Sequence, residues 1–194
     1  MLNSLLAKFK FFSFLIIFIP NSSFAQYDET INHNINNFWS IGLDYGFQMS
    51  GIKSEDFISS NYSPLIRFSI DRCLDKNISI RFGYQGRYFN TIADDIKHYY
   101  NFYYTEAVFN VKNIFLGLKD KGAHEVFFHM GPGYFYNFYL SKLTINGLIG
   151  GTNAISISSS FKLTLDISAV IGWDIYQGNE DILPSISVGG VYLF

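Results

Sequence analysis

Apolar and polar residues alternate along most of this 194-residue chain. The clearest segment is 39–49, where all eleven positions alternate between large apolar side chains and Ser, Gly, Asp or Gln. Because successive side chains of a β-strand point to opposite faces, this period of two predicts a strand with one apolar face. The same pattern predicts eight strands, over residues 39–49, 64–72, 77–89, 102–115, 125–138, 142–157, 161–176 and 184–194.

Two of these strands are less regular than the others. In 102–115 the period blurs after Val111, and 142–157 contains three glycines. Pro132, in 125–138, has no backbone N–H and removes one ladder hydrogen bond, so we expect a bulge there.

Eight amphipathic strands fit either a soluble barrel or a membrane barrel. The polar face is rich in Gly and Ser as well as charge, which suits a narrow interior, whereas the apolar face carries aromatics that would overfill an eight-stranded lumen. We therefore expect an all-β fold, an eight-stranded antiparallel up-and-down transmembrane β-barrel with its apolar face toward lipid. Aromatic girdles are expected from Trp39, Phe161, Tyr192 and Phe194 at one end and Tyr88, Tyr136 and Trp173 at the other.

The connections fall into two sets, one at each end of the expected barrel. A periplasmic N-terminus puts turns 73–77, 116–123 and 158–160 on the periplasmic side. Extracellular loops tend to be the longer ones, and the other set contains two long segments. That set comprises residues 50–63, 90–101, 139–141 and 177–183.

The overall composition excludes several classes of protein. Hydrophobic residues make up 48% of the chain, aromatics 19% and charged residues only 15%, against a usual charged share of ~25%. Lys and Arg number 14 against 16 Asp and Glu, for a net charge of −2, and no basic run exists to bind nucleic acid. A single Cys excludes a disulfide framework and a zinc site built from several cysteines.

The N-terminus has the form of a secretory signal peptide. Two lysines precede the apolar run 11–19, and small residues stand just before Gln26. The alternative, a membrane anchor, needs ~20 apolar residues, far more than this run supplies. We therefore expect three parts: a cleaved signal peptide at 1–25, a short periplasmic segment at 26–37 and an outer-membrane barrel domain at 38–194.

Two short motifs resemble those of a known group. The segment 130–134 (Met-Gly-Pro-Gly-Tyr) is similar to a glycine–proline–glycine strand, and 189–194 ends the chain in Gly-Gly-Val-Tyr-Leu-Phe. With the signal peptide, they resemble the small outer-membrane β-barrel proteins of Bacteroidota, the PorT-like "outer membrane protein beta-barrel domain" group. The resemblance implies fold and location rather than one activity. It also implies a C-terminal signal for the barrel-assembly machinery, formed by Val188, Tyr192 and Phe194.

Nine charged residues are expected on the inward face, four positive and five negative: Asp44, Arg67, Asp71, Arg81, Arg87, Glu106, Lys162, Asp166 and Asp174. If the first hairpin places Gln48 near Ser63, Asp44 lies opposite Arg67, and the next turn brings Asp71 close to Arg81. An unpaired buried charge is very costly, so a plug of paired charges is favoured over an ion or solute path.

An enzyme is the alternative function. Neither H-E-x-x-H nor G-x-S-x-G occurs in the sequence. Asp94, Asp95 and His98 share one segment, which leaves an acid–base or metal site there as the alternative to a solvated loop. A lipid-modifying outer-membrane enzyme is therefore the second hypothesis, and a soluble periplasmic barrel is the third.

The first hypothesis is a non-catalytic, monomeric outer-membrane barrel without cofactor or metal. It acts in envelope structure, in surface interaction through segments 50–63 and 90–101, or in an envelope or secretion assembly. Its expected partners are outer-membrane lipid, the barrel-assembly machinery during biogenesis and a protein at the extracellular loops, with no nucleic acid.

Overall fold

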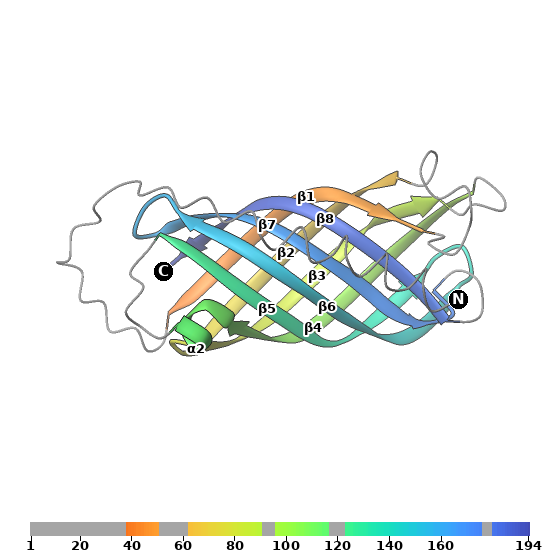
Figure 1. Ribbon diagram of the computed structural model, residues 1–194. Coiled ribbons are helices and arrows are strands. Elements are labelled where there is room, and N and C mark those ends of the chain that lie inside the picture. The colour runs from red at the N-terminus through yellow and green to blue at the C-terminus, as the bar shows by residue number, and fades with distance from the viewer. Residues whose placement is uncertain (1–37, 51–61, 91–95, 117–122, 176–179) are drawn as a thin grey trace, which may run out of the picture. The chain divides into compact units, whose positions relative to one another are not determined.

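Eight antiparallel strands close into one barrel in chain order (Figure 1). The computed structural model describes residues 38–50, 62–90, 96–116, 123–175 and 180–194. The strands are β1 (Trp39–Met49), β2 (Tyr62–Asp75), β3 (Ile78–Asn90), β4 (Lys97–Asn110), β5 (His124–Asn137), β6 (Lys142–Ser156), β7 (Phe161–Trp173) and β8 (Glu180–Leu193). A short helix, α2 (Val111–Leu116), joins β4 to β5. The fold class predicted from the alternation is confirmed.

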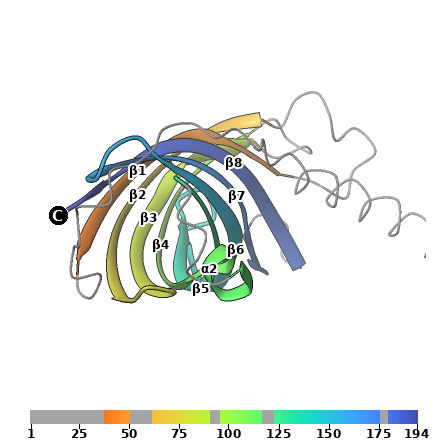
Figure 2. The same ribbon diagram turned by 60° about the vertical axis from the view of Figure 1, so that its left-hand side comes forward.

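Pairing between the first and last strands completes the barrel. β1 pairs with β2 on one side and with β8 on the other, from Ser40 opposite Leu193 to Gln48 opposite Ser185. The strands curve around one enclosed lumen (Figure 2). Closure gives the backbone N–H and C=O groups of both edge strands a partner. None of the helices in the described part of the chain is long and apolar enough to cross a bilayer.

The two ends of the barrel differ in their connections. At the end called here the terminal end, Trp39 N donates to Phe194 O at 3.0 Å. The turn after β2 and helix α2 lie at this end. The opposite end, called the loop end, receives the connections that follow β1, β3, β5 and β7.

The outer surface of the barrel is apolar. Leu43, Phe82 and Ile145, which point outward, are 61%, 53% and 69% exposed, and their strand neighbours on the inward face are buried or half-buried. The expected girdle residues are outward as well, with Trp39 and Trp173 among the exposed side chains. Such a face is suited to hydrocarbon rather than water.

The C-terminal residues expected to form the assembly signal lie on this outer face. Val188, Tyr192 and Phe194 are all exposed, and the Tyr192 and Phe194 rings stack with centroids 6.3 Å apart. Their recognition by an assembly machinery stays a prediction.

Strand bounds agree closely for β1 and differ most for β4. The sequence predicted 102–115, but β4 spans Lys97–Asn110 and helix α2 follows at once. Asn110 Oδ1 accepts a hydrogen bond from Asn113 N at 3.0 Å, which is the contact of a helix N-cap. The apolar residues after Asn110 therefore belong to a helical turn, which explains why their period of two faded.

Pro132 interrupts pairing without forming the expected bulge. On the β4 side no partner pair includes Gly131 or Pro132, and the register is the same before and after them. Pairing with β6 continues through both residues. The register shift that does occur lies between Cys73 and Asp75 on β2, next to a turn. A strand can thus lose a ladder hydrogen bond at Pro while keeping its residue count.

Several predicted segments lie outside the described residues. They are the signal peptide 1–25, the segment 26–37, most of the loop 50–63 and of the turn 116–123, residues 91–95 of the loop 90–101 (with Asp94 and Asp95), and residues 177–179 of the loop 177–183.

Two glycines provide a test of close packing in the wall. A Cβ on Gly46 would lie 2.0 Å from Ile186 O and 2.5 Å from Ser187 Cα, whereas on Gly147 the nearest atom would be 3.8 Å away. Gly46→Val should therefore destabilise the barrel by about 3 kcal/mol or more through overpacking against backbone. Gly147→Val should leave a heat-modifiable barrel on gels and an unchanged urea midpoint. Equal behaviour of the two variants would contradict this packing.

Candidate functional site

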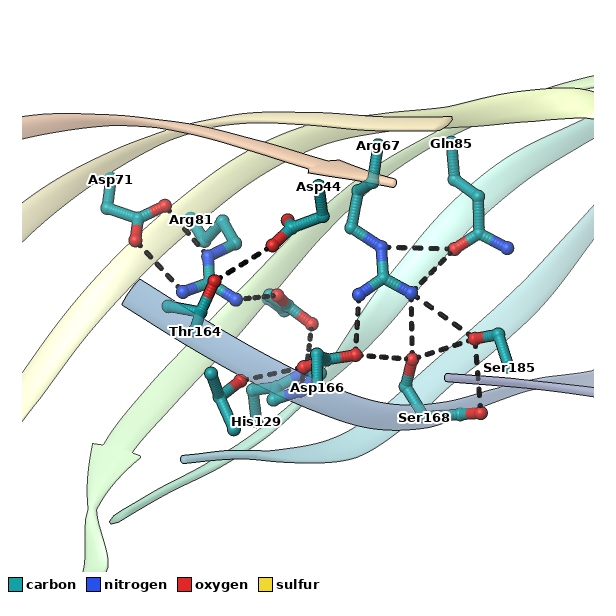
Figure 3. Close-up of polar contacts among 12 residues, drawn as sticks. Asp44, Arg67, Asp71, Arg81, Gln85, His129, Thr164, Asp166, Ser168 and Ser185 are labelled. Carbon is teal, nitrogen blue, oxygen red and sulfur yellow. Dashed lines mark hydrogen bonds and ion pairs between the residues drawn. The ribbon is translucent and has the colours of Figure 1, made fainter. Parts of the chain in front are cut away.

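Six charged or titratable side chains meet inside the barrel, and Figure 3 shows most of them reaching toward one another across the lumen. They form what we call the interior network: Arg67, Asp71, Arg81, Glu106, His129 and Asp166. These residues come from five strands, β2, β3, β4, β5 and β7. All of them are at inward positions of the alternation, which is why one closed face collects them.

Arg81 links two carboxylates at the side of the network nearer the terminal end. Its Nε and Nη2 donate to the two oxygens of Asp71 at 2.8 and 3.0 Å, and its Nη1 donates to Glu106 Oε1 at 3.1 Å. The fork of a guanidinium fits a carboxylate in this two-bond arrangement. The predicted proximity of Asp71 and Arg81 is confirmed, and their strands place them opposite each other.

His129 lies between two carboxylates. Its Nδ1 is 2.7 Å from Glu106 Oε2, and its Nε2 is 2.8 Å from Asp166 Oδ2. An ionised carboxylate only accepts hydrogen bonds, so both ring nitrogens must donate when both acids are ionised, and the ring is then an imidazolium. His129 therefore acts as a positive bridge between the two acids.

Arg67 closes the network on the side nearer the loop end. Its Nη1 donates to Asp166 Oδ1 at 2.5 Å, and its Nη2 donates to Gln85 Oε1 at 3.0 Å and to Ser168 Oγ at 2.8 Å. Only 2% of Arg67 is exposed. The ion pair joins β2 to β7, two strands that are not neighbours in the sheet.

Asp166 has no capacity left for a further partner. Its two oxygens receive four hydrogen bonds, from Arg67, His129, Thr152 and Ser168. A carboxylate has about four lone-pair sites. The network is thus satisfied internally, which is the condition under which buried charges are tolerated.

This arrangement offers little for catalysis. Both nitrogens of His129 are occupied by carboxylates, so the imidazole activates no hydroxyl or thiol. Within the described ranges, no group of side chains is arranged to hold a metal ion.

Asp44 lies opposite Arg67 on the neighbouring strand, as predicted. Its hydrogen bond nevertheless comes from Thr164 Oγ1 at 3.0 Å, because the Arg67 guanidinium reaches across the lumen to Asp166 instead. Strand register placed the two residues correctly but did not determine the ion pair.

Lys162 and Asp174 differ in how well they fit the predicted inward set. Lys162 lies inside and forms an ion pair with Glu125, a residue that the prediction did not include. Asp174 follows the end of β7 and pairs with Lys142 at 2.8 Å, and both side chains are substantially exposed. Its φ of 59° shows that the extended strand has already ended, so Asp174 belongs to the rim and not to the interior.

Arg87 is not part of the interior either. It pairs with inward-facing Leu65 and Tyr100, but its own side chain is exposed. Its φ of 136° lies in the region that L-residues other than glycine rarely adopt, at a cost of about 1–3 kcal/mol. This local twist removes Arg87 from the alternation that the sequence analysis assumed.

The loop half of the lumen is aromatic, which the sequence analysis did not expect of the inner face. We call this group the aromatic plug; it comprises Phe89, Tyr100, Phe102, Tyr104, Phe135, Leu148, Val170, Ile175 and Leu183, all buried. Tyr100 and Phe135 stack with centroids 4.7 Å apart. Tyr100 Oη donates to Gln48 at 2.5 Å, and together with Gln85 it connects the plug to Arg67.

Inward glycines make room for these rings. A Cβ on Gly83 would lie 2.1 Å from the Tyr104 ring, and one on Gly133 would lie 2.5 Å from the Phe102 ring. An eight-stranded lumen holds large side chains when a neighbouring strand supplies none at that position. The glycines noted in the sequence therefore signal aromatic filling as well as a narrow interior.

His98, the histidine of the alternative enzyme hypothesis, is buried on β4 instead of lying in a solvated loop. Its ring stacks on Phe89 at 5.3 Å, and its Nδ1 is 3.1 Å from Asn137 Nδ2.

Sequence reasoning missed His129, Gln85 and Glu125 as members of the interior contacts. All three stand at positions of the alternation that face inward, and this was the feature of the sequence that could have identified them.

No protein-family model and no curated protein matches the sequence. Solved structures do match the fold. Neisserial surface protein A (NspA) aligns with a TM-score of 0.55 and 8% identity, over 80% of this chain and 97% of that one. The N-terminal β-barrel domain of Pseudomonas aeruginosa OprF aligns with a TM-score of 0.51 and 9% identity, over 79% and 97%. The chain therefore shares the fold of small bacterial outer-membrane barrels.

Removing Arg67 should reveal how much the network contributes to stability. Arg67→Met leaves Asp166 and Glu106 with too little positive charge, and should cost about 3–5 kcal/mol of unfolding free energy. Lys142→Met removes the exposed partner of Asp174 and should cost no more than about 1 kcal/mol. Urea unfolding in lipid vesicles measures both. A small effect of Arg67→Met would mean that the buried ions do not depend on one another.

Proposed function

We propose that this protein is an integral outer-membrane barrel that conducts no ions and holds its loop-end segments at the cell surface. In this proposal the function is non-catalytic and lies in envelope structure or in contact with a partner. The observation that carries it is the filled lumen, with the interior network in one part and the aromatic plug in the other.

The outer face supports a membrane location. Large apolar side chains are exposed on every strand, among them Phe47, Phe68, Tyr103 and Leu163. In water this surface would be a severe aggregation hazard. In a bilayer the same surface contacts hydrocarbon, and the closed ladder leaves no strand edge there.

Because the number of strands is even, the first and last residues of the barrel lie on the same side of the membrane in this proposal. The terminal end carries the turn after β2 and helix α2, and we place it in the periplasm because residues 1–25 resemble a signal peptide. The loop end then faces outward. We propose two roles for the loop end: it binds a ligand at the cell surface, or it binds another component of a secretion assembly.

Conductance tests the filled lumen. Protein extracted from the outer-membrane fraction and inserted in planar bilayers should give no stable open-channel current, because two successive layers of side chains obstruct the path. Phe138→Ala, at an exposed position in the turn after β5, serves as a control that should remain silent. Steady currents from the wild-type protein would overturn the proposal, and recovery in the soluble periplasmic fraction would contradict the membrane location itself.

Photo-crosslinking tests the side on which a partner binds. A photoreactive aromatic residue at Leu140, in the connection after β5, should capture a partner from intact cells. The same residue at Lys76, in the turn after β2, is the matched control and should capture none. Crosslinks only from position 76 would place the partner in the periplasm and refute the surface role.

A further inference from the structure

Arg87 is held in an unfavourable backbone conformation whose result is an exposed guanidinium. Gln85 and Phe89, two residues away on either side, are fully buried in the lumen, while Arg87 is exposed. Its φ of 136° is the local change that separates it from them. Strained residues persist where the surrounding structure enforces them, and they gather at functional sites. The barrel thus excludes this cation from its interior near the loop end.

A second cation and a group of tyrosines surround this position. On β3 and β4, Tyr88 and Tyr99 point outward with ring centroids 5.6 Å apart, and Lys97 Nζ lies 5.1 Å above the Tyr88 ring. Tyr84 and Tyr103 continue the aromatic surface along the same two strands, and their ring centroids are 5.3 Å apart. Lys97 is exposed as well. The surface therefore combines positive charge at the loop end with aromatic rings on the hydrocarbon side.

Neither cation has an acidic partner among the residues that the structure describes, whereas Arg67, Lys142 and Lys162 have one each and Arg81 has two. Arg87 on β3 lies opposite Tyr100 on β4, and Lys97 lies three residues before Tyr100 on β4. The two Cα atoms are therefore roughly 11 Å apart, from the rise along a strand and the spacing between strands. Both side chains are long enough to meet one anion placed between them.

We propose that Arg87 and Lys97 bind the phosphate of a phosphorylated lipid whose acyl chains lie on the tyrosines of β3 and β4. Guanidinium and ammonium groups are the usual phosphate ligands, and aromatic side chains occupy the level of the headgroups in membrane barrels. A lipid fits both parts of the surface, whereas free phosphate uses only the charges. This inference rests on the proposed membrane location.

Native mass spectrometry of the purified full chain in detergent tests the site, with diphosphoryl lipid A as the probe. Arg87→Gln and Lys97→Gln should each weaken binding about fivefold, and the double variant about twenty-five-fold. Lys76→Gln, which removes a cation at the opposite end, should bind as the wild type does. Diacylglycerol, which has acyl chains but no phosphate, should bind the wild type and the four variants equally. Unchanged lipid A binding by the double variant would overturn the proposal.

Arg87→Gly separates the charge from the backbone. Glycine accepts a φ of 136° without strain, so this variant should unfold at the same or a higher urea concentration while it loses lipid A as Arg87→Gln does. If it keeps wild-type affinity, the conformation serves another purpose and the site is refuted.

Two further measurements distinguish a lipid phosphate from a free phosphate, and failure of the lipid site from failure of the membrane location. Inorganic phosphate at millimolar concentration should not displace lipid A; complete displacement would show that the ligand is a free anion, against the proposal. Failure of the site would leave the membrane location standing if the protein is still recovered in the outer-membrane fraction. A protein recovered as soluble would remove the basis of both.

Discussion

Closure of the backbone hydrogen-bond ladder between β1 and β8 is the constraint from which the rest of the barrel follows. Hydrocarbon provides no partner for an N–H or C=O group, so a sheet inside it must have no edge. Eight strands are enough to close, and they leave an interior only as wide as the side chains that fill it. Outward residues are then free to be large and apolar, and inward residues must fit one another.

The lumen meets that requirement in two different ways. Toward the terminal end, charges of opposite sign satisfy one another, and Asp166 alone receives four hydrogen bonds. Toward the loop end, rings pack against glycines of the neighbouring strands, as Phe102 does at Gly133. Gln85 and Tyr100 join the two layers. The interior is filled, and the carboxylate of Asp166 can accept no further hydrogen bond. These two features favour a structural role for the barrel over a catalytic one.

Local pattern was sufficient to identify the eight strands and to place neighbours across a hairpin, although not to fix every strand end. It predicted β1 from Trp39 to Met49 and the pairing of Asp71 with Arg81, because both depend on residues close in sequence. It could not predict the ion pair between Arg67 and Asp166, which exists only after the barrel has closed. The end of β4 depended on a capping contact of Asn110, and the exposure of Arg87 on a single backbone angle. Neither changes the alternation of residue types.

The way the interior charges are shared has a consequence for the history of the sequence. Arg67 and Asp166 stand far apart in the chain, yet each neutralises the other, and His129 is of use only beside its two acids. A lineage that loses one of these residues must soon replace the others. The six positions should therefore be inherited or exchanged as a block, while the outer face drifts among apolar residues. NspA shares the barrel fold at 8% identity, so the wall of the barrel requires little agreement in sequence.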